Sequence, residues 1–170
     1  VLAVAAAHPL AEVLRREVSA RTAELQHERE VLRTLSVTTL QALVNALEAK
    51  DAHLKGHSAR VAELGAKVAV ACGLDAEAVE QVRIAGRLHD IGKIGIREAI
   101  LNKQGPLTDE EFSHVKNHAE IGAQILAPMT HLGPVIGFVR HHHERWDGKG
   151  YPAGLAGTAI PLGARILGAV

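Results

Sequence analysis

The sequence predicts an all-α protein, and three observations support that fold class. Aromatic residues make up only 2% of the chain, so leucine, isoleucine, valine and alanine must build the core, and the dominance of alanine and leucine favours helices. Apolar residues recur every three or four positions in several segments, which is the helical period. No segment shows the period of two that is typical of half-buried strands.

Composition and charge exclude several protein classes. An apolar content of 47% over 170 residues indicates a folded protein and argues against disorder. The 19 basic and 19 acidic residues balance, so nothing overall indicates a surface for polymeric nucleic acid or acidic lipid. The single cysteine, Cys72, excludes an internal disulfide framework and is compatible with a cytoplasmic location. It lies in the apolar run VAVACGL, where we expect a small buried side chain.

The two ends of the sequence suggest a piece of a longer protein. The opening VLAVAAA is apolar but far too short to span a bilayer, which needs about 20 such residues. The sequence begins without Met and stops inside the apolar run ARILGAV. We therefore expect a fragment of a longer protein, in which VLAVAAA could be the end of a membrane helix or of an upstream domain.

Residues 1–35 are predicted to form an N-terminal linker helix. Val18, Leu25 and Leu32 repeat every seven residues, as in a coiled coil. The companion positions are only half apolar: Leu14, Arg21, Glu28 and Leu35. A signalling helix that pairs two protomers into a homodimer and a solvated connecting helix both fit this pattern.

Residues 36–170 are predicted to form one helical domain. Asp75 is the expected N-cap of one helix. Thr108 and Glu111 are spaced as a capping box, and Pro134 suits the first turn of a later helix. The stretch DGKGYPAGLAG predicts a glycine-rich loop. The predicted helices cover residues 36–51, 58–72, 76–88, 108–125 and 134–143, and another begins in IPLGARILGAV.

One carboxylate and several imidazoles lie on or beside the apolar faces of different predicted helices. They are His57, His89, Asp90, His118, His142 and His143. Each histidine alone is more simply a hydrogen-bonded core residue. Together they would be costly to bury unless a cation satisfied them. Because helical bundles build metal sites from inward-facing side chains, we expect these residues to converge on metal ions.

The ligand types narrow the chemistry of this site. Imidazole and carboxylate without thiolate suit iron, manganese, nickel or zinc better than a structural cysteine-rich zinc site. Asp90 has two oxygens and could bridge two ions, which would hold and activate a water for phosphoester hydrolysis. Lys93 follows three residues later. It could stabilise charge on a phosphoryl oxygen, or be a surface lysine paired with a neighbour. Asp90 and Lys93 are therefore the predicted catalytic residues.

A series of motifs carries a family resemblance. The motifs are ALEAKDAHLKGHSARVAELG, HDIGKIGI, PLTDEEF, KNHAEIGAQIL and HHERWDGKGYPAGLAGTAIPLGARIL, and they run from about Leu40 to Val170. They resemble the HD-GYP domain, a branch of the HD-superfamily metal-dependent phosphohydrolases. The resemblance implies a helical enzyme that hydrolyses the bacterial second messenger cyclic di-GMP to linear pGpG or to GMP. It also implies two or three metal ions, commonly iron or manganese.

The resemblance assigns roles residue by residue. It implies that Asp90 is the bridging ligand and that Lys93 faces the scissile phosphate. Arg145 could contact phosphate, and Trp146 could stack on guanine or cap the core. The implied metal ligands are His57, His89, Asp90, His118, His142 and His143. The implied substrate loop contains Gly150, Tyr151 and Pro152.

Two departures from the family pattern matter. His53 stands four residues before His57, where the family commonly has an aromatic residue and its trinuclear members have a metal ligand. It could bind a third ion or be a polar surface replacement for tyrosine. A further aspartate ligand would follow Val170, so the chain as given is expected to bind metal and turn over less well. A catalytically weak signalling or interaction module, and a phosphohydrolase for another nucleotide, remain alternatives.

Overall fold

The computed structural model describes residues 2–49 and 56–170, with the side chains of residues 2–8 left out of the description. The chain divides into two compact units, Val1–Thr38 and Thr39–Val170. Helices dominate both, and no strand occurs among the described residues, where an isolated bridge joins Asp147 to Ala156. The predicted all-α class is confirmed, whereas the boundary drawn between a linker and a phosphohydrolase domain at residue 35 stays a prediction.

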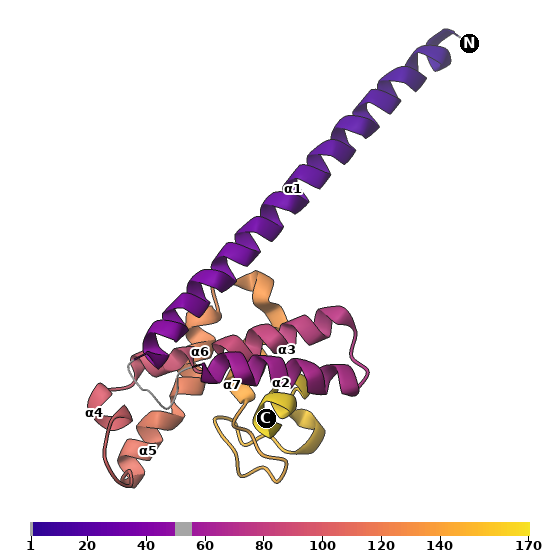
Figure 1. The fold of residues 1–170 in the computed structure, drawn as a ribbon. Coiled ribbons are helices and arrows are strands. Elements are labelled where there is room, and N and C mark those ends of the chain that lie inside the picture. Colours follow the sequence, from indigo (N-terminus) through magenta and orange to yellow (C-terminus); the bar gives the residue numbers. More distant parts are fainter. Residues whose placement is uncertain (1, 50–55) are drawn as a thin grey trace. The chain divides into compact units, whose positions relative to one another are not determined.

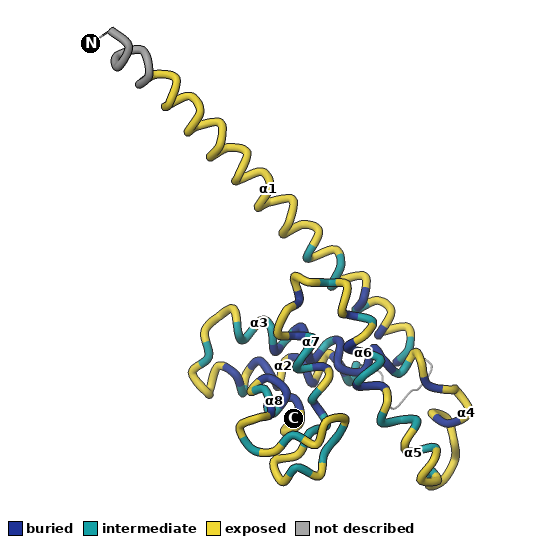
Figure 2. The backbone as a smooth tube through the Cα atoms, turned by 180° about the vertical axis from the view of Figure 1, so that it is seen from behind, coloured by how far each residue is buried: buried dark blue, intermediate teal, exposed yellow. Residues whose placement is uncertain are grey.

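Helix α1 (Leu2–Glu48) is continuous through Ser36, where the sequence analysis began a new helix. The stretch 10–48 contains neither glycine nor proline, and the Ser36 hydroxyl donates within the helix to the Leu32 carbonyl at 2.8 Å. The change in apolar spacing therefore moves the apolar face around the helix without interrupting the backbone. Residues 10–32 are exposed, and burial begins at Leu40 (Figure 2).

The second unit is built around α2 (His57–Ala71) and α3 (Ala76–Leu88), which pack side by side (Figure 1). A Cβ at Gly86 of α3 would lie 2.6 Å from the Ala62 Cα of α2, so the missing side chain lets the two backbones approach. The face of α2 that packs here is rich in small residues. Leu64 of the same helix is 47% exposed and lies away from this face.

The predicted caps are present. The Asp75 side chain accepts a hydrogen bond from the Ala78 amide at 2.8 Å and begins α3. Thr108 and Glu111 form a reciprocal capping box at the start of α5 (Asp109–Lys116). Each cap stabilises its helix by about 1 kcal/mol. Local sequence therefore determines where these helices begin.

Two expectations about this unit are wrong. The helix predicted over 108–125 is divided at Asn117 into α5 and α6 (His118–Leu126). The division places His118 in a first helical turn, where its ring donates to the Val115 carbonyl. Cys72 is exposed, because it is the C-cap that follows the last residue of α2 and lies at the surface end of that helix.

The remaining elements complete the core around α7 (Gly133–His141), which packs against α3, α6 and α8 (Leu162–Ala169). The short elements are η1 (Ile91–Gly95), α4 (Glu98–Leu101), η2 (Thr130–Leu132) and η3 (Gly157–Ala159). None of the described helices has by itself the length and apolarity to cross a membrane. One pair bent by 116°, Asp109–Leu126 with Thr130–His141, meets the test of length and composition jointly.

Candidate metal centre

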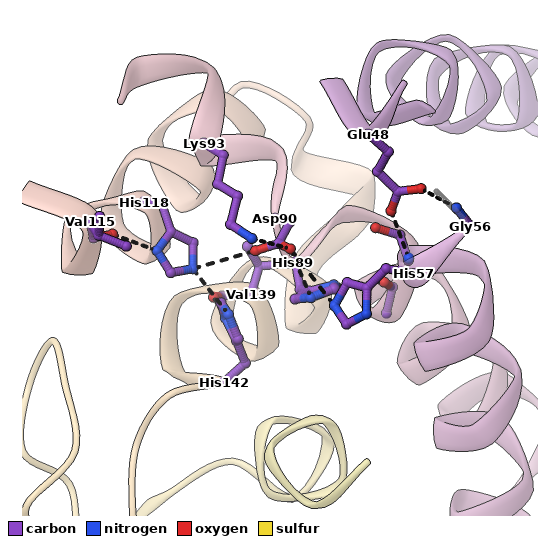
Figure 3. Close-up of polar contacts among 12 residues, drawn as sticks. Glu48, Gly56, His57, His89, Asp90, Lys93, Val115, His118, Val139 and His142 are labelled. Carbon is purple, nitrogen blue, oxygen red and sulfur yellow. Dashed lines mark hydrogen bonds and ion pairs between the residues drawn. The ribbon is translucent and has the colours of Figure 1, made fainter. Parts of the chain in front are cut away.

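Asp90 lies among imidazoles that come from four helices (Figure 3). It follows His89, the C-cap of α3, and is 8% exposed. Its Oδ2 lies 3.4 Å from His89 Nε2 and 3.9 Å from His57 Nε2. Its Oδ1 lies 3.7 Å from His118 Nε2. Each carboxylate oxygen therefore faces a different set of imidazole nitrogens.

The ligand-type atoms of the described residues form two groups, each with its atoms within 4.8 Å of one another. The α2–α3 group consists of His57, His89 and Asp90. The α6–α7 group consists of His118, His142 and His143. The two groups adjoin, because the ring centroids of His89 and His142 are 5.2 Å apart. The structure thus brings together all six predicted ligands that it describes, while their role as ligands stays a prediction.

Backbone carbonyls determine the tautomers of three of these histidines. In each, Nδ1 lies against the carbonyl three residues earlier: His89 on Gly86 at 2.8 Å, His118 on Val115 at 2.7 Å and His142 on Val139 at 2.6 Å. A carbonyl only accepts, so Nδ1 carries the proton and donates. Each Nε2 then keeps its lone pair and is available as a ligand.

The spacing of these lone pairs fits a metal centre. His118 Nε2 and His142 Nε2 are 3.3 Å apart, although neither has a proton to share. Two atoms that each lie about 2.1 Å from one ion are about 3.0–3.4 Å apart in tetrahedral or octahedral geometry. A cation between them would replace repulsion with attraction in this buried site. The residues present therefore fit divalent ions that accept imidazole and carboxylate ligands.

Burial favours the neutral form of four of these imidazoles. Burial lowers the pKa of His89 and of His118. Burial and the neighbouring His143 lower the pKa of His142 well below its ordinary value. Burial and His118 lower the pKa of His143 to about 4. Neutral imidazole is the protonation state that binds metal, so these four side chains are ready to act as ligands at neutral pH.

Lys93 extends from η1 to the Asp90 carboxylate, with Nζ 2.7 Å from Oδ2. Burial acts to raise the pKa of Asp90, but His89 and Lys93 outweigh it and lower that pKa. Both Asp90 and Lys93 line a cavity of about 490 Å³ whose walls are mostly apolar. Lys93 is thus paired with a neighbour, as one alternative expected, yet it lies in a cavity beside the carboxylate.

Gly92 explains how η1 reaches α6. A Cβ at this position would collide with the carbonyl oxygen of His118. Because glycine has no Cβ, the segment that follows Asp90 packs directly on the first turn of α6. Gly92, the first glycine of HDIGKIG, therefore lets Asp90 and His118 come together.

The loop after α7 is held against the centre by Glu144, which the sequence analysis did not single out. Its side chain is fully buried, and it accepts hydrogen bonds from the amides of Ala153 at 2.7 Å and Leu155 at 3.0 Å. The Tyr151 ring stacks on His143 with centroids 4.7 Å apart. Burial, with Asp90, raises the pKa of Tyr151 to about 12. The sequence did hold a signal for Glu144: an acid that directly follows the histidine run and precedes a glycine-rich loop.

The other predicted substrate residues lie outside the imidazole cluster. Gly150 packs on the backbone of Glu144 and Arg145, where a Cβ would not fit, and Pro152 is exposed. Arg145 has a 65% exposed side chain and donates to both carboxylate oxygens of Asp147, at 3.0 and 2.8 Å. The predicted contacts of these three residues with substrate stay predictions.

Trp146 and His53 complete the predicted set. Trp146 is 65% exposed, so the alternative in which it caps the core is wrong. The centroid of its ring lies 5.8 Å from the Arg165 guanidinium. His53 lies outside the described residues, so a third ion stays a prediction. His141 lies beside the Glu144 carboxylate, with Nδ1 3.5 Å from Oε1.

Comparisons with known proteins point in the same direction. A family model described as the HD domain matches residues 41–170. The chain is 40% identical over 131 residues to the cyclic di-GMP phosphodiesterase response regulator RpfG of Xanthomonas campestris, which covers 76% of this chain and 35% of that protein. It is 42% identical over 132 residues to a cyclic di-GMP phosphodiesterase of Thermotoga maritima, covering 75% of this chain and 35% of the relative.

Relatives with another named substrate also match. The chain is 37% identical over 133 residues to the 3'3'-cGAMP-specific phosphodiesterase 1 of Vibrio cholerae, covering 78% of this chain and 30% of the relative. The chain spans about a third of the length of the curated relatives that it matches. What these proteins hydrolyse is therefore a property of much longer chains.

Proposed function

The chain belongs to the HD domain family, and from this premise we propose that it is a metal-dependent phosphodiesterase that hydrolyses cyclic di-GMP. The observation that carries the proposal is Asp90, whose two oxygens face two adjoining groups of imidazole nitrogens. Similarity to relatives named cyclic di-GMP phosphodiesterases supports the choice of substrate. The expected products are linear pGpG, GMP or both.

Two divalent ions fit the two groups of ligands. The α2–α3 group would hold one ion and the α6–α7 group the other, and Asp90, which also faces His118, would serve both. Iron or manganese suits this set of imidazoles and one carboxylate. When bound, such ions supply activated water and neutralise charge during phosphodiester hydrolysis. The carbonyls behind the imidazoles hold each Nε2 toward the centre.

Lys93 is proposed to bind a non-bridging oxygen of the scissile phosphate. Its ammonium lines the cavity beside Asp90, where positive charge would stabilise the charge that develops in the transition state. The apolar walls formed by residues such as Ile96 and Leu107 suit the faces of a nucleobase. Tyr151, on the loop that Glu144 holds, borders His143 and is proposed to limit the pocket on that side.

The cellular setting is also a proposal. We propose that the chain works in the cytoplasm, downstream of a sensory or receiver domain in its parent protein, and that α1 pairs two protomers. The exposed apolar residues Val18, Leu25 and Leu32, at intervals of seven along α1, support the pairing. Similarity to the 3'3'-cGAMP-specific relative supports that dinucleotide as a second candidate substrate.

The test uses the purified full chain loaded with Mn²⁺ or Fe²⁺ under anaerobic conditions. Cyclic di-GMP and 3'3'-cGAMP are supplied separately, and linear products are separated by chromatography. We expect cyclic di-GMP to be opened. Asp90→Asn should lower turnover by about 100-fold, because the amide nitrogen that replaces one oxygen cannot bind a metal and the side chain loses its negative charge. Asp109→Asn, the same change at an exposed position, is the matched control.

Each outcome has a definite consequence. Faster hydrolysis of 3'3'-cGAMP than of cyclic di-GMP would replace the proposed substrate. Metal binding without hydrolysis of either dinucleotide would favour an interaction module over an enzyme. Unchanged turnover in Asp90→Asn would exclude the carboxylate from the reaction.

A further inference from the structure

Glu48, in the last turn of α1, is buried although it is an acid. It is 7% exposed. It follows the buried residues Leu40 and Val44 at steps of four, so it lies on the same face of the helix. Burying a carboxylate is costly unless hydrogen bonds satisfy it. The partners of its two oxygens therefore indicate what it does.

Both oxygens accept hydrogen bonds from the start of α2 (Figure 3). Glu48 Oε2 accepts from the Gly56 amide at 2.9 Å, and Oε1 accepts from the Ser58 amide at 2.7 Å. Amides in a first helical turn have no partner within the helix, and Gly56, the N-cap, has no side chain to supply one. Ser58 is fully buried, so water has no access to replace the carboxylate. Glu48 thus caps α2 from another helix.

The residue between these two amides is His57, whose Nε2 lies 3.9 Å from Asp90 Oδ2. It is the first residue of α2, so the orientation of that turn determines where its imidazole points. Its side chain is 36% exposed, compared with 8% for His89. Packing therefore constrains His57 less than its neighbour, and the position of its backbone matters more.

We propose that Glu48 is a positioning residue that holds the first turn of α2, so that His57 stays in the α2–α3 group with His89 and Asp90. The inference rests on the proposed function, because it presupposes a metal centre. Two histidines of the α6–α7 group are anchored elsewhere, His118 by the Val115 carbonyl of α5 and His142 by the Val139 carbonyl of α7. Loss of the Glu48 carboxylate therefore weakens one half of the centre and spares the other.

Glu48→Ala in the full chain tests this, with Mn²⁺ alone as the probe. In the metal-free protein, amide hydrogen exchange at Gly56 and Ser58 is expected to accelerate at least tenfold, while exchange in α6 is unchanged. In a Mn²⁺ titration followed by calorimetry, one of the two sites is expected to weaken at least tenfold and the other to keep its affinity. A general loss of stability would weaken both sites together.

Two further variants sharpen the test. Glu63→Gln changes an exposed acid of α2, the helix that Glu48 caps, and is expected to alter neither exchange at Gly56 and Ser58 nor Mn²⁺ binding. Glu48→Gln keeps one acceptor oxygen, gives an intermediate effect, and carries the test if Glu48→Ala does not fold. Equal weakening of both Mn²⁺ sites, or unchanged exchange at Gly56 and Ser58, overturns the role of Glu48. A wild-type chain that binds no Mn²⁺ overturns the metal centre itself, and this inference with it.

Discussion

At the scale of single residues, the centre combines neutral imidazoles with one ionised carboxylate. Burial lowers the pKa of His89, His118 and His142, and lowers that of His143 to about 4. Below pH 6.5, the ordinary pKa of histidine, these side chains would be protonated in the unfolded chain. In the metal-free fold they must stay neutral. The metal-free fold therefore has a specific weakness toward acid.

The predicted consequence is a loss of stability of the metal-free chain as pH falls from 6.5 toward 4. Because the pKa of His143 is lower in the fold, the unfolded state binds protons first, and stability falls across that window. His143 alone should contribute about 1 kcal/mol of the loss by pH 5, after allowance for its partial exposure. Urea unfolding of the metal-free chain at pH 7.5 and pH 5 measures the difference.

A pair of variants identifies the source of this pH dependence. His143→Gln should reduce the loss, because the substituted side chain does not titrate. His131→Gln, the same change at an exposed histidine, should leave it unchanged. Equal free energies of unfolding at both pH values would contradict the prediction. The lowered pKa of Asp90 acts only at more acidic pH, outside this window.

At the scale of elements, two buried acids connect segments that share no helical hydrogen bonds with each other. Glu48 connects the end of α1 to the start of α2, and Glu144 connects the end of α7 to the loop around Tyr151. In both, carboxylate oxygens satisfy backbone amides that helices leave without partners. These contacts hold loops and turns against the imidazole cluster, which side-chain packing alone would leave loose.

Glu144→Ala is predicted to loosen the loop 147–157 without dispersing the imidazoles. The amides of Ala153 and Leu155 lose their acceptors, which should lower the free energy of unfolding by about 1–2 kcal/mol. Tyr151 would no longer be held on His143, so the KM for cyclic di-GMP should rise more than kcat falls. Steady-state kinetics, together with hydrogen exchange in the loop, checks this expectation.

Lys149→Gln is the matched control for this change, because Lys149 is exposed on the same loop. It should leave stability and KM as they are. If Glu144→Ala changed kcat alone, with loop exchange as slow as in the wild type, the hydrogen bonds of Glu144 to the loop would not govern substrate binding.

At the scale of the whole molecule, the exposed apolar face of α1 leads us to predict that the chain forms a dimer. Val18, Leu25 and Leu32 are 64%, 47% and 62% exposed and recur every seven residues. Pairing with a second copy would remove this apolar surface from water. Leu25→Glu should therefore shift the full chain from dimer to monomer in sedimentation experiments.

Ala23→Glu is the control for this prediction, since it adds the same charge two residues away, on another face of the helix. It should leave the dimer intact. A wild-type chain that sediments as a monomer at tens of micromolar would instead make α1 a solvated connecting helix. Arg21 and Glu28 favour this second outcome, because they place charges at the companion positions of the heptad repeat.

The sequence by itself determined the features that depend on nearby residues. The helical period gave the all-α class, and Asp75 and the Thr108–Glu111 pair predicted where two helices begin, because caps act within one turn. The candidate ligands could also be chosen from the sequence, since costly polar side chains stood on apolar faces of several helices. These inferences need residue type and spacing alone.

Only the tertiary structure decided which of these residues meet. It brought Asp90 between two imidazole groups and gave Glu48 and Glu144 their partners. It left Cys72 exposed where burial was expected, and it left Trp146 exposed where capping of the core was one of two alternatives. These outcomes depend on which segments pack together and how closely, as at Gly86 and Gly92. Periodicity along one helix carries no information about the helix that it will face, so contacts between distant segments had to be seen in the fold.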